Sequence, residues 1–281
     1  MSNNLLAFSI RFLFLAVFCC FSLSSVAQKC QLKNSAFQVG ERIDYTIYYH
    51  LAGVWVGAGE VYFQVDSAKI GKRSYYHFDS YGTTFKRYDW IYKVRDHYQA
   101  YTSMKDFQPL RFKREVNEGD TYIREDYLFD AREHQVYSLR KMEEDLPYVK
   151  DTVPYPNCSF DVLSMIYYAR NIDFSDAEVG DKVPIKIFID NKSHESYIRY
   201  LGKEEIKVKG LGKYRCIKFS PLLIEGTIFN AGEDMTVWVT DDQNRVPILI
   251  ETPILVGSIR ARVSKMKGLL HATDALIEKA D

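Results

Sequence analysis

Apolar and polar residues alternate along most of this chain, and this alternation restricts the fold more than any other feature. In ERIDYTIYYH, residues 41–50, isoleucine or tyrosine takes every second position from Ile43 to Tyr49, which places these side chains on one face of a strand. EVYFQVD, PLRFKREV and KVPIKIFID repeat the pattern, and KIGK and NEGD read as turns. About a dozen such segments with hairpin-like spacing predict a mainly β fold, an antiparallel sheet that curls or closes.

One segment departs from this pattern. Residues 157–171, NCSFDVLSMIYYARN, are apolar on almost every side of a helix, with only a narrow stripe of Asp161, Ser164 and Tyr168. A helix resting on a flat sheet would show a broad polar face. We therefore predict one main helix, at about 159–171, enclosed by a strongly curved antiparallel sheet or open barrel.

Residues at both ends of this predicted helix are of types that cap a helix or interact favourably with its dipole. Asn157 or Ser159 is expected to cap the amino end, and Asp161 in the first turn suits the positive end of the helix dipole. Arg170 suits the negative end.

The first 27 residues are typical of a secretory signal peptide. Arg11 precedes FLFLAVFCCFSL, an apolar run too short to span a bilayer. Ser25 and Ala27 are small residues at the −3 and −1 positions of a signal-peptidase site, which predicts cleavage after Ala27. The mature chain, residues 28–281, is then predicted to be a single β-rich domain without a transmembrane span, exported to the periplasm or associated with the outer envelope.

Removal of the signal peptide leaves three cysteines, Cys30, Cys158 and Cys216. In an oxidising compartment they allow at most one internal disulfide, and the sequence leaves all three pairings open. No two of them have the spacing of a zinc site or a redox motif.

Composition and motifs argue against several functions. The chain has 37 basic and 37 acidic residues, so its net charge of zero gives no electrostatic reason to bind nucleic acid or an anionic membrane surface. It contains no nucleophile elbow, zinc-protease motif, phosphate loop or dinucleotide fingerprint. We therefore predict no catalytic residue, no metal and no cofactor. The six histidines lack ligand-like spacing: His50, His77, His97, His134, His194 and His271.

Five helix residues are candidate ligand contacts: Asp161, Ser164, Met165, Tyr168 and Arg170. In one interpretation Arg170 binds an anionic head group, and the apolar side chains hold a tail in a cavity between helix and sheet. In the other, the helix fills the core, and Asp161 or Arg170 bonds to the sheet backbone and fixes the helix orientation. The sequence favours the second interpretation, because protein interiors are usually densely packed.

Four segments together resemble a known family: GERIDYTIYY, VRDHYQAYTSMKDFQPLRF, FDVLSMIYYARN and VWVTDDQNRVPILIET. The family comprises uncharacterised exported bacterial proteins and is known as domain of unknown function 3108. The resemblance covers most of the mature chain, and Asp161, Ser164, Tyr168 and Arg170 sit where that family has Asp, Ser, an aromatic residue and Arg. It implies an envelope location and a β-rich fold, but no known activity. The predicted architecture also resembles the half-barrel around a helix of periplasmic lipoprotein carriers, at the level of fold only.

Three functional hypotheses follow, of which the last, a hydrolase without a recognised motif, would need a cleft with clustered carboxylates or histidines of shifted pKa. The first is a non-enzymatic envelope protein that binds or carries an apolar or amphipathic ligand, such as a lipid. The alternative is an envelope scaffold that binds another protein or a glycan through sheet edges or aromatic patches.

Overall fold

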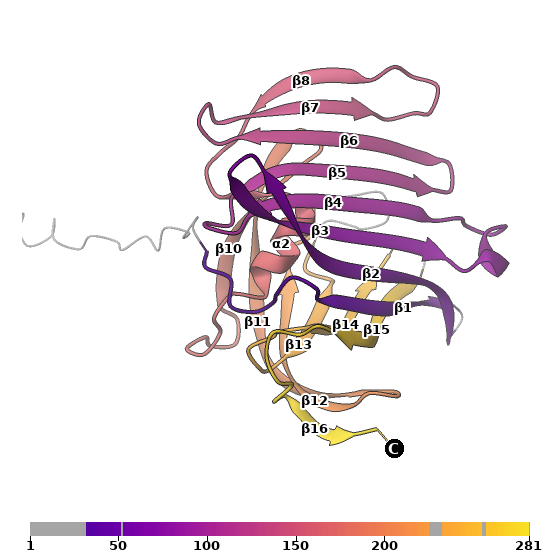
Figure 1. Cartoon of the computed structure of the whole chain (residues 1–281). Coiled ribbons are helices and arrows are strands. Elements are labelled where there is room, and N and C mark those ends of the chain that lie inside the picture. The colour runs from indigo at the N-terminus through magenta and orange to yellow at the C-terminus, as the bar shows by residue number, and fades with distance from the viewer. Residues whose placement is uncertain (1–31, 52, 225–231, 255–256, 281) are drawn as a thin grey trace, which may run out of the picture.

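The computed structural model describes residues 32–51, 53–224, 232–254 and 257–280, and the predicted signal peptide and Cys30 lie outside them. One continuous sheet of sixteen strands bends around a short helix (Figure 1). The strands are β1 (Arg42–Leu51), β2 (Val54–Ile70), β3 (Arg73–Thr84), β4 (Arg95–Ser103), β5 (Pro109–Glu118), β6 (Thr121–Asp130), β7 (Gln135–Lys141), β8 (Val149–Pro154), β9 (Ser159–Phe160), β10 (Lys182–Ile189), β11 (Lys192–Val208), β12 (Gly212–Pro221), β13 (Thr236–Thr240), β14 (Pro247–Pro253), β15 (Ser258–Lys267) and β16 (Leu276–Lys279).

The sheet is a long meander whose two halves meet at β1. Strands β8 to β1 lie in reverse chain order, β1 pairs with β15, and the order then runs from β15 down to β9, with β16 beside β12. Among the described strands all pairs are antiparallel except β9 with β10. The ends of this order, β8 and β9, are not paired with each other, so the sheet is not closed into a barrel. The predicted strongly curved antiparallel sheet is confirmed.

The predicted helix is present but shorter than predicted. Helix α2 spans Val162–Ala169, and a single 3₁₀ turn, η1, spans Lys86–Tyr88. The caps predicted at positions 157 and 159 are wrong, because Asp161 is the N-cap and its side chain accepts a hydrogen bond from the Ser164 amide. Residues 159–160 instead form the short strand β9 beside β10.

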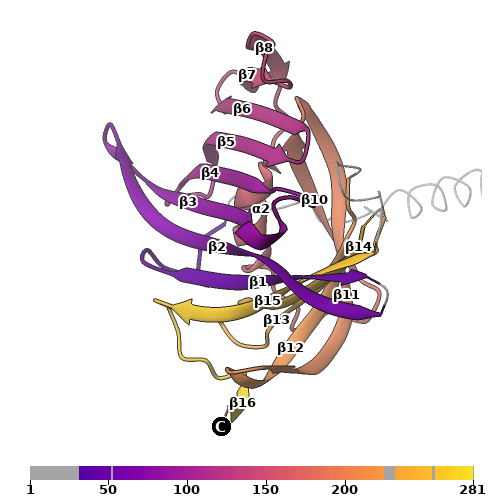
Figure 2. The same ribbon diagram turned by 90° about the vertical axis from the view of Figure 1, so that its right-hand side faces the viewer.

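Helix α2 lies inside the bend of the sheet, against β4, β9 and β10 (Figure 2). Leu163, Met165 and Tyr167 are buried, and the ring of Tyr167 stacks on Phe78 of β3 with 3.9 Å between ring centroids. Only one edge of the helix meets solvent, where Ile166 is 41% exposed. The apolar surface predicted for this segment is therefore mostly covered by aromatic side chains of the core.

Side chains hold the two ends of the open sheet together. The two-residue turn between β10 and β11, Asp190–Asn191, has positive φ at both positions, as a tight hairpin requires. Its Asp190 carboxylate lies 2.7 Å from the Arg114 guanidinium on β5, and the Asn191 amide oxygen accepts a 2.7 Å hydrogen bond from Ser138 on β7. Glu125 of β6, fully buried, also pairs with Arg114 at 2.8 Å. Polar contacts thus take the place of backbone pairing across the gap.

The structure narrows the disulfide pairing. Cys158 is disulfide-bonded, whereas Cys216 on β12 is free and buried. This excludes the two pairings that include Cys216. Among the described residues, no helix is both long enough and apolar enough to cross a membrane.

Peptide mapping of the mature protein under non-reducing conditions is expected to yield one linked pair, Cys30 with Cys158. In the predicted mature chain, residues 28–281, Cys30 is the one cysteine besides Cys158 and the free Cys216. The buried Cys216 thiol should react with an alkylating reagent only after unfolding, because burial raises its pKa to about 12. The reduced protein is the control. A linked peptide containing Cys216 would contradict the assignment.

Candidate ligand-binding sites

The structure brings the five predicted residues together, all of them buried around α2. The Asp161 carboxylate accepts hydrogen bonds from the amide and the hydroxyl of Ser164, at 2.8 and 2.7 Å. The Ser164 hydroxyl shares a further 2.8 Å bond with Thr102 of β4. Burial raises the pKa of Asp161 to about 6, although the Ser164 bonds act in the opposite direction. This polar group therefore fixes the start of the helix to the sheet.

Arg170, just after α2, lies in a fully enclosed contact network. Its guanidinium pairs with both carboxylate oxygens of Glu41, with Nη2 2.9 Å from Oε2. It also donates to the backbone carbonyls of Asn244, at 2.9 Å, and of Ala36, at 3.2 Å. The side chains of Arg170 and Glu41 are 2% and 1% exposed. Arg170 therefore connects the helix to the segment before β1 and to the turn between β13 and β14.

Met165 and Tyr168 complete the predicted set. Tyr168 packs against Phe160 and Phe107, with ring centroids 4.8 and 6.4 Å away, and Met165 is 5% exposed. The charged groups of the set already bond to protein, as the structural interpretation requires, although Arg170 bonds to loop carbonyls rather than to strands. The ligand-binding role of the five residues stays a prediction.

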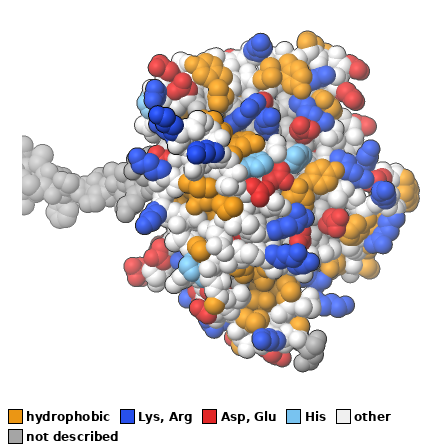
Figure 3. Space-filling view, viewed as in Figure 1, with side chains coloured by type: hydrophobic (Ala, Val, Ile, Leu, Met, Phe, Trp, Pro, Cys, Tyr) orange, Lys and Arg blue, Asp and Glu red, His pale blue; other side chains and the backbone are white. Residues whose placement is uncertain are grey.

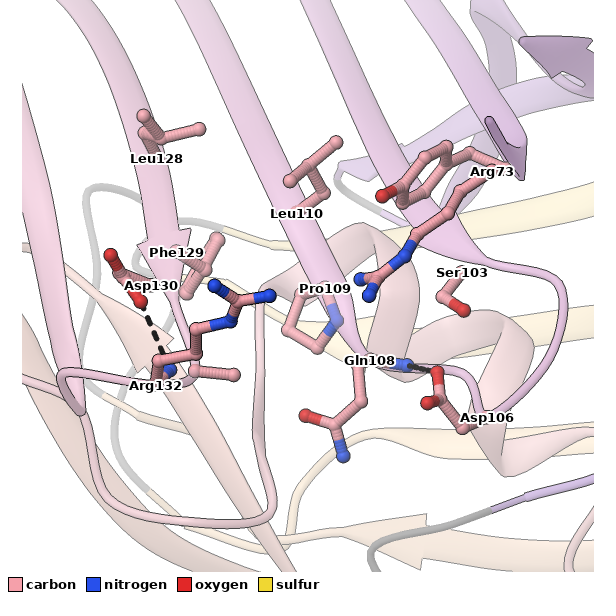
Figure 4. Close-up of a pocket in the computed structure, with 12 residues that line it drawn as sticks. Arg73, Ser103, Asp106, Gln108, Pro109, Leu110, Leu128, Phe129, Asp130 and Arg132 are labelled. Carbon is pink, nitrogen blue, oxygen red and sulfur yellow. Dashed lines mark hydrogen bonds between the residues drawn. The ribbon is translucent and has the colours of Figure 1, made fainter. Parts of the chain in front are cut away.

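A separate open pocket of about 440 Å³ lies at one end of β3 to β6 (Figure 4). Its apolar surface comes from Pro109, Leu110, Leu128 and Phe129. The pocket forms here because β4 and β6 end where β3 and β5 begin, and because the β4–β5 register shifts after Tyr101.

Two guanidinium groups face this pocket from opposite sides. Arg73 and Arg132 both point toward the space around the Pro109 ring (Figure 4). Both side chains are exposed, and neither guanidinium has a hydrogen-bond or ion-pair partner among the described residues. The site therefore offers two free cationic donors beside an apolar surface.

The pocket also contains two carboxylates, and both are engaged in local turns. Asp130 Oδ1 accepts hydrogen bonds from the amides of Arg132 and Glu133, at 2.9 and 3.1 Å. Asp106 Oδ1 accepts a weaker bond from the Gln108 amide at 3.4 Å. The acidic groups thus shape the rim of the pocket, and the arginines keep their donors for a ligand.

A second polar cluster lies on the outer face of β2, β3 and β4. Asp79 accepts a 2.6 Å hydrogen bond from the Tyr62 hydroxyl and lies 2.7 Å from His97 Nε2. Burial raises the pKa of Asp79, but the bonds from Tyr62 and His97 outweigh it and hold the pKa below its ordinary value. Figure 3 shows histidine beside acidic side chains in the middle of this face. Over the described residues, no group of three His, Cys, Asp or Glu could hold a metal ion.

Comparison with known protein families identifies the family of this chain. Residues 44–264 match the family described as "Protein of unknown function (DUF3108)". The chain belongs to the DUF3108 family. The resemblance predicted from the four sequence segments is thus confirmed. A comparison with curated proteins found no match.

The DUF3108 chain is also similar to a solved structure, the crystal structure of a beta-barrel-like protein of domain of unknown function DUF1849 from Brucella abortus. The match has a TM-score of 0.51 and 9% sequence identity, and it covers 84% of this chain and 100% of that chain. At this identity the likeness shows the fold alone.

The pocket residues of the DUF3108 protein were not predicted from the sequence. Arg73 follows the turn-like KIGK, and Arg132 lies in the polar sequence DARE, where charged residues read as solvated. Nothing local connects two arginines 59 positions apart (132 − 73). They meet because the antiparallel order of β3 to β6 brings both turns to the same end of the sheet.

Proposed function

We propose that this DUF3108 protein is a non-enzymatic protein of the cell envelope that binds an amphipathic anion in the pocket between Arg73 and Arg132. The observation that carries the proposal is the pair of unpartnered guanidinium groups on opposite sides of an apolar surface (Figure 4). The envelope location rests on the signal peptide predicted for residues 1–27.

The chemistry of the pocket suits a carboxylate or a phosphate attached to an apolar group. A guanidinium presents parallel N–H donors that match two oxygens of such an anion. Leu128 is 46% exposed, so a ligand that covers it and the neighbouring Leu110 removes apolar surface from water. Because the pocket is open, the ligand is held at the protein surface and exchanges with solvent.

The core around α2 is a weaker candidate for the ligand. Phe78, Phe107 and Phe160 surround Tyr167 and Tyr168 at ring-contact distances. An acyl chain placed there would have to displace packed rings, each of which contributes about 1.5–3 kcal/mol to folding. The pocket at the end of β3 to β6 requires no such rearrangement.

The alternative function, a scaffold for another envelope protein, is supported by apolar side chains near the edge strand β8. Tyr148 is 52% and Val149 is 64% exposed. The edge itself is poorly suited to accept another strand, because Pro154 has no amide and the Thr152 amide already donates to Asp151. A partner here would bind to side chains rather than add a strand.

Titration calorimetry with dodecanoate is expected to show binding to the mature protein, and Arg73→Gln and Arg132→Gln are each expected to weaken it. A hydrogen bond to a charged group contributes about 1.5–3 kcal/mol, so each loss corresponds to about 10- to 100-fold in affinity. The matched control is Lys72→Gln, which removes the same charge from the residue beside Arg73 but outside the pocket. Dodecanol, which lacks the anionic group, should bind much more weakly. Equal binding of dodecanol, or unchanged affinity in both arginine variants, would contradict the proposal.

A further inference from the structure

The connection between β3 and β4 forms an exposed projection at the end of β3 opposite the pocket (Figure 1). Trp90 is 82%, Ile91 is 62% and Tyr92 is 45% exposed. Exposed basic residues flank them on both sides. We call these six residues the aromatic tip: Lys86, Arg87, Trp90, Ile91, Tyr92 and Lys93.

The aromatic tip is held in a defined conformation. The Trp90 indole N–H donates a 3.0 Å hydrogen bond to the Arg87 carbonyl. Below it, the Asp89 carboxylate accepts bonds from Arg95, at 2.6 Å, and from the Thr84 hydroxyl, at 2.8 Å. Bonds within the loop therefore keep large apolar side chains in water, although burial would be favourable.

The hydrogen bond of the Trp90 indole N–H allows an apolar phase to cover the Trp90 ring. An indole moved into an apolar layer loses its water contacts, and an unpaired N–H costs free energy there. In this loop the donor is already satisfied by the Arg87 carbonyl. The exposed part of the ring can enter an apolar phase without leaving a donor unpaired.

Charge favours a negatively charged partner. Lys86, Arg87 and Lys93 are exposed on the aromatic tip, and the one acidic residue within the loop, Asp89, is neutralised by Arg95. Glu118, Asp96 and Asp120 are acidic residues near Tyr92, and they reduce this excess. In Figure 3, hydrophobic and basic side chains lie next to one another at the right-hand end of the molecule, where the β3–β4 connection projects in the same view in Figure 1. The local excess is notable because the whole chain has a net charge of zero.

The neighbouring hairpin extends the apolar surface. At the β1–β2 hairpin, Val54 is 59% and Val56 is 41% exposed. The hairpin and the loop are joined by a 2.9 Å bond from the Phe85 amide to the Ala58 carbonyl. The Arg87 guanidinium also donates to the Gly57 carbonyl at 3.3 Å. Two joined connections at one end of the sheet thus carry exposed apolar residues.

We propose that the aromatic tip docks this protein on an anionic phospholipid bilayer, with Trp90 and Ile91 entering the interface and Lys86, Arg87 and Lys93 facing the head groups. Tryptophan and tyrosine prefer the membrane–water interface, and basic side chains are attracted to anionic lipids. A bilayer suits an apex that projects from the sheet better than a protein groove would, because it needs no matching cavity. The inference does not rest on the pocket, which lies at the other end of β3 and would stay in water.

Flotation with vesicles of phosphatidylglycerol and phosphatidylcholine tests the proposal on the mature protein. Three variants are compared with wild type: Trp90→Ser with Ile91→Ser, the triple variant Lys86→Gln, Arg87→Gln and Lys93→Gln, and the control Tyr148→Ser with Val149→Ser. The control removes similarly exposed apolar side chains from the region of β8. The thermal unfolding midpoint of each variant shows that it remains folded.

Wild type is expected to float with anionic vesicles and to lose binding at high salt. The triple charge variant should bind about a hundredfold more weakly, and the Trp90 and Ile91 variant about tenfold or more. The β8 control and Arg73→Gln should bind like wild type, which separates this result from the pocket proposal. Absence of wild-type binding, or unchanged binding in both tip variants, overturns the proposal. The proposal is also overturned if the wild-type tip retains another protein in a pull-down, the tip variants do not, and vesicle binding is the same in all of them.

Discussion

Replacement of Arg170 by methionine is expected to lower the free energy of unfolding by about 3–5 kcal/mol, because it leaves Glu41 as a buried charge without a counterion. The Glu41 side chain is 1% exposed, so water cannot replace the lost partner. The carbonyls of Ala36 and Asn244 lose a donor in the same substitution. Urea denaturation at neutral pH measures the change.

A nearby arginine provides the matched control for this prediction. Arg245 follows Asn244 and pairs with Asp173 at 3.4 Å, but Asp173 is 73% exposed. Arg245→Met should therefore cost no more than about 1 kcal/mol. Combining Glu41→Gln with Arg170→Met should recover part of the loss, since the buried charge is then removed. If Arg170→Met costs no more than Arg245→Met, Arg170 does not anchor the helix.

Replacement of Asp96 by asparagine is expected to stabilise the protein at neutral pH and to leave it nearly unchanged in acid. Asp96 on β4 and Glu118 on β5 are each 9% exposed, and their side chains share a hydrogen bond. Burial and the neighbouring Glu118 raise the pKa of Asp96 from 3.8 to about 7. Asparagine can still accept the 3.0 Å bond from the Asn117 amide and can donate to Glu118.

The sign of the pH dependence follows from the direction of this shift. Between about pH 4 and 7 the folded protein keeps a proton on Asp96 that the unfolded chain has released. The resulting stabilisation is complete below pH 4 and is lost as the pH rises through 7. Between pH 5 and 8, the stability of Asp96→Asn relative to wild type should rise by about 2–4 kcal/mol.

Asp79 provides a control of opposite sign. Its pKa is below the ordinary value, so its stabilising contribution is present above about pH 4 and lost in acid. Asp79→Asn should therefore be less stable than wild type at neutral pH, and this difference should shrink as the pH falls. Denaturant titrations of all three proteins at several pH values measure both trends. If the difference in unfolding free energy between Asp96→Asn and wild type does not change with pH, the pKa of Asp96 is not raised in the folded protein.

Neither the pairing of Asp96 with Glu118 nor that of Arg170 with Glu41 was predicted from the sequence, whereas several local features were. The alternation in residues 41–50 predicted that Ile43 and Tyr45 share one face of a strand, because side-chain direction in a strand depends on position, and the structure shows that both are buried. The unusual composition of residues 157–171 correctly predicted an enclosed helix. Its cap was misassigned, because Asp161 and Ser159 both suit that position and the pairing of residues 159–160 with β10 decided between them.

What the sequence determined by itself was local: strands of period two, turns between them and one apolar helix. These features depend on neighbouring residues, so a single chain reveals them. Only the tertiary structure decided which distant residues meet, such as Glu41 with Arg170, or Arg73 with Arg132 across a pocket. These contacts between distant residues depend on strand order and on the curvature of the whole sheet. Many weak contacts together determine that curvature, and no local sequence pattern encodes it.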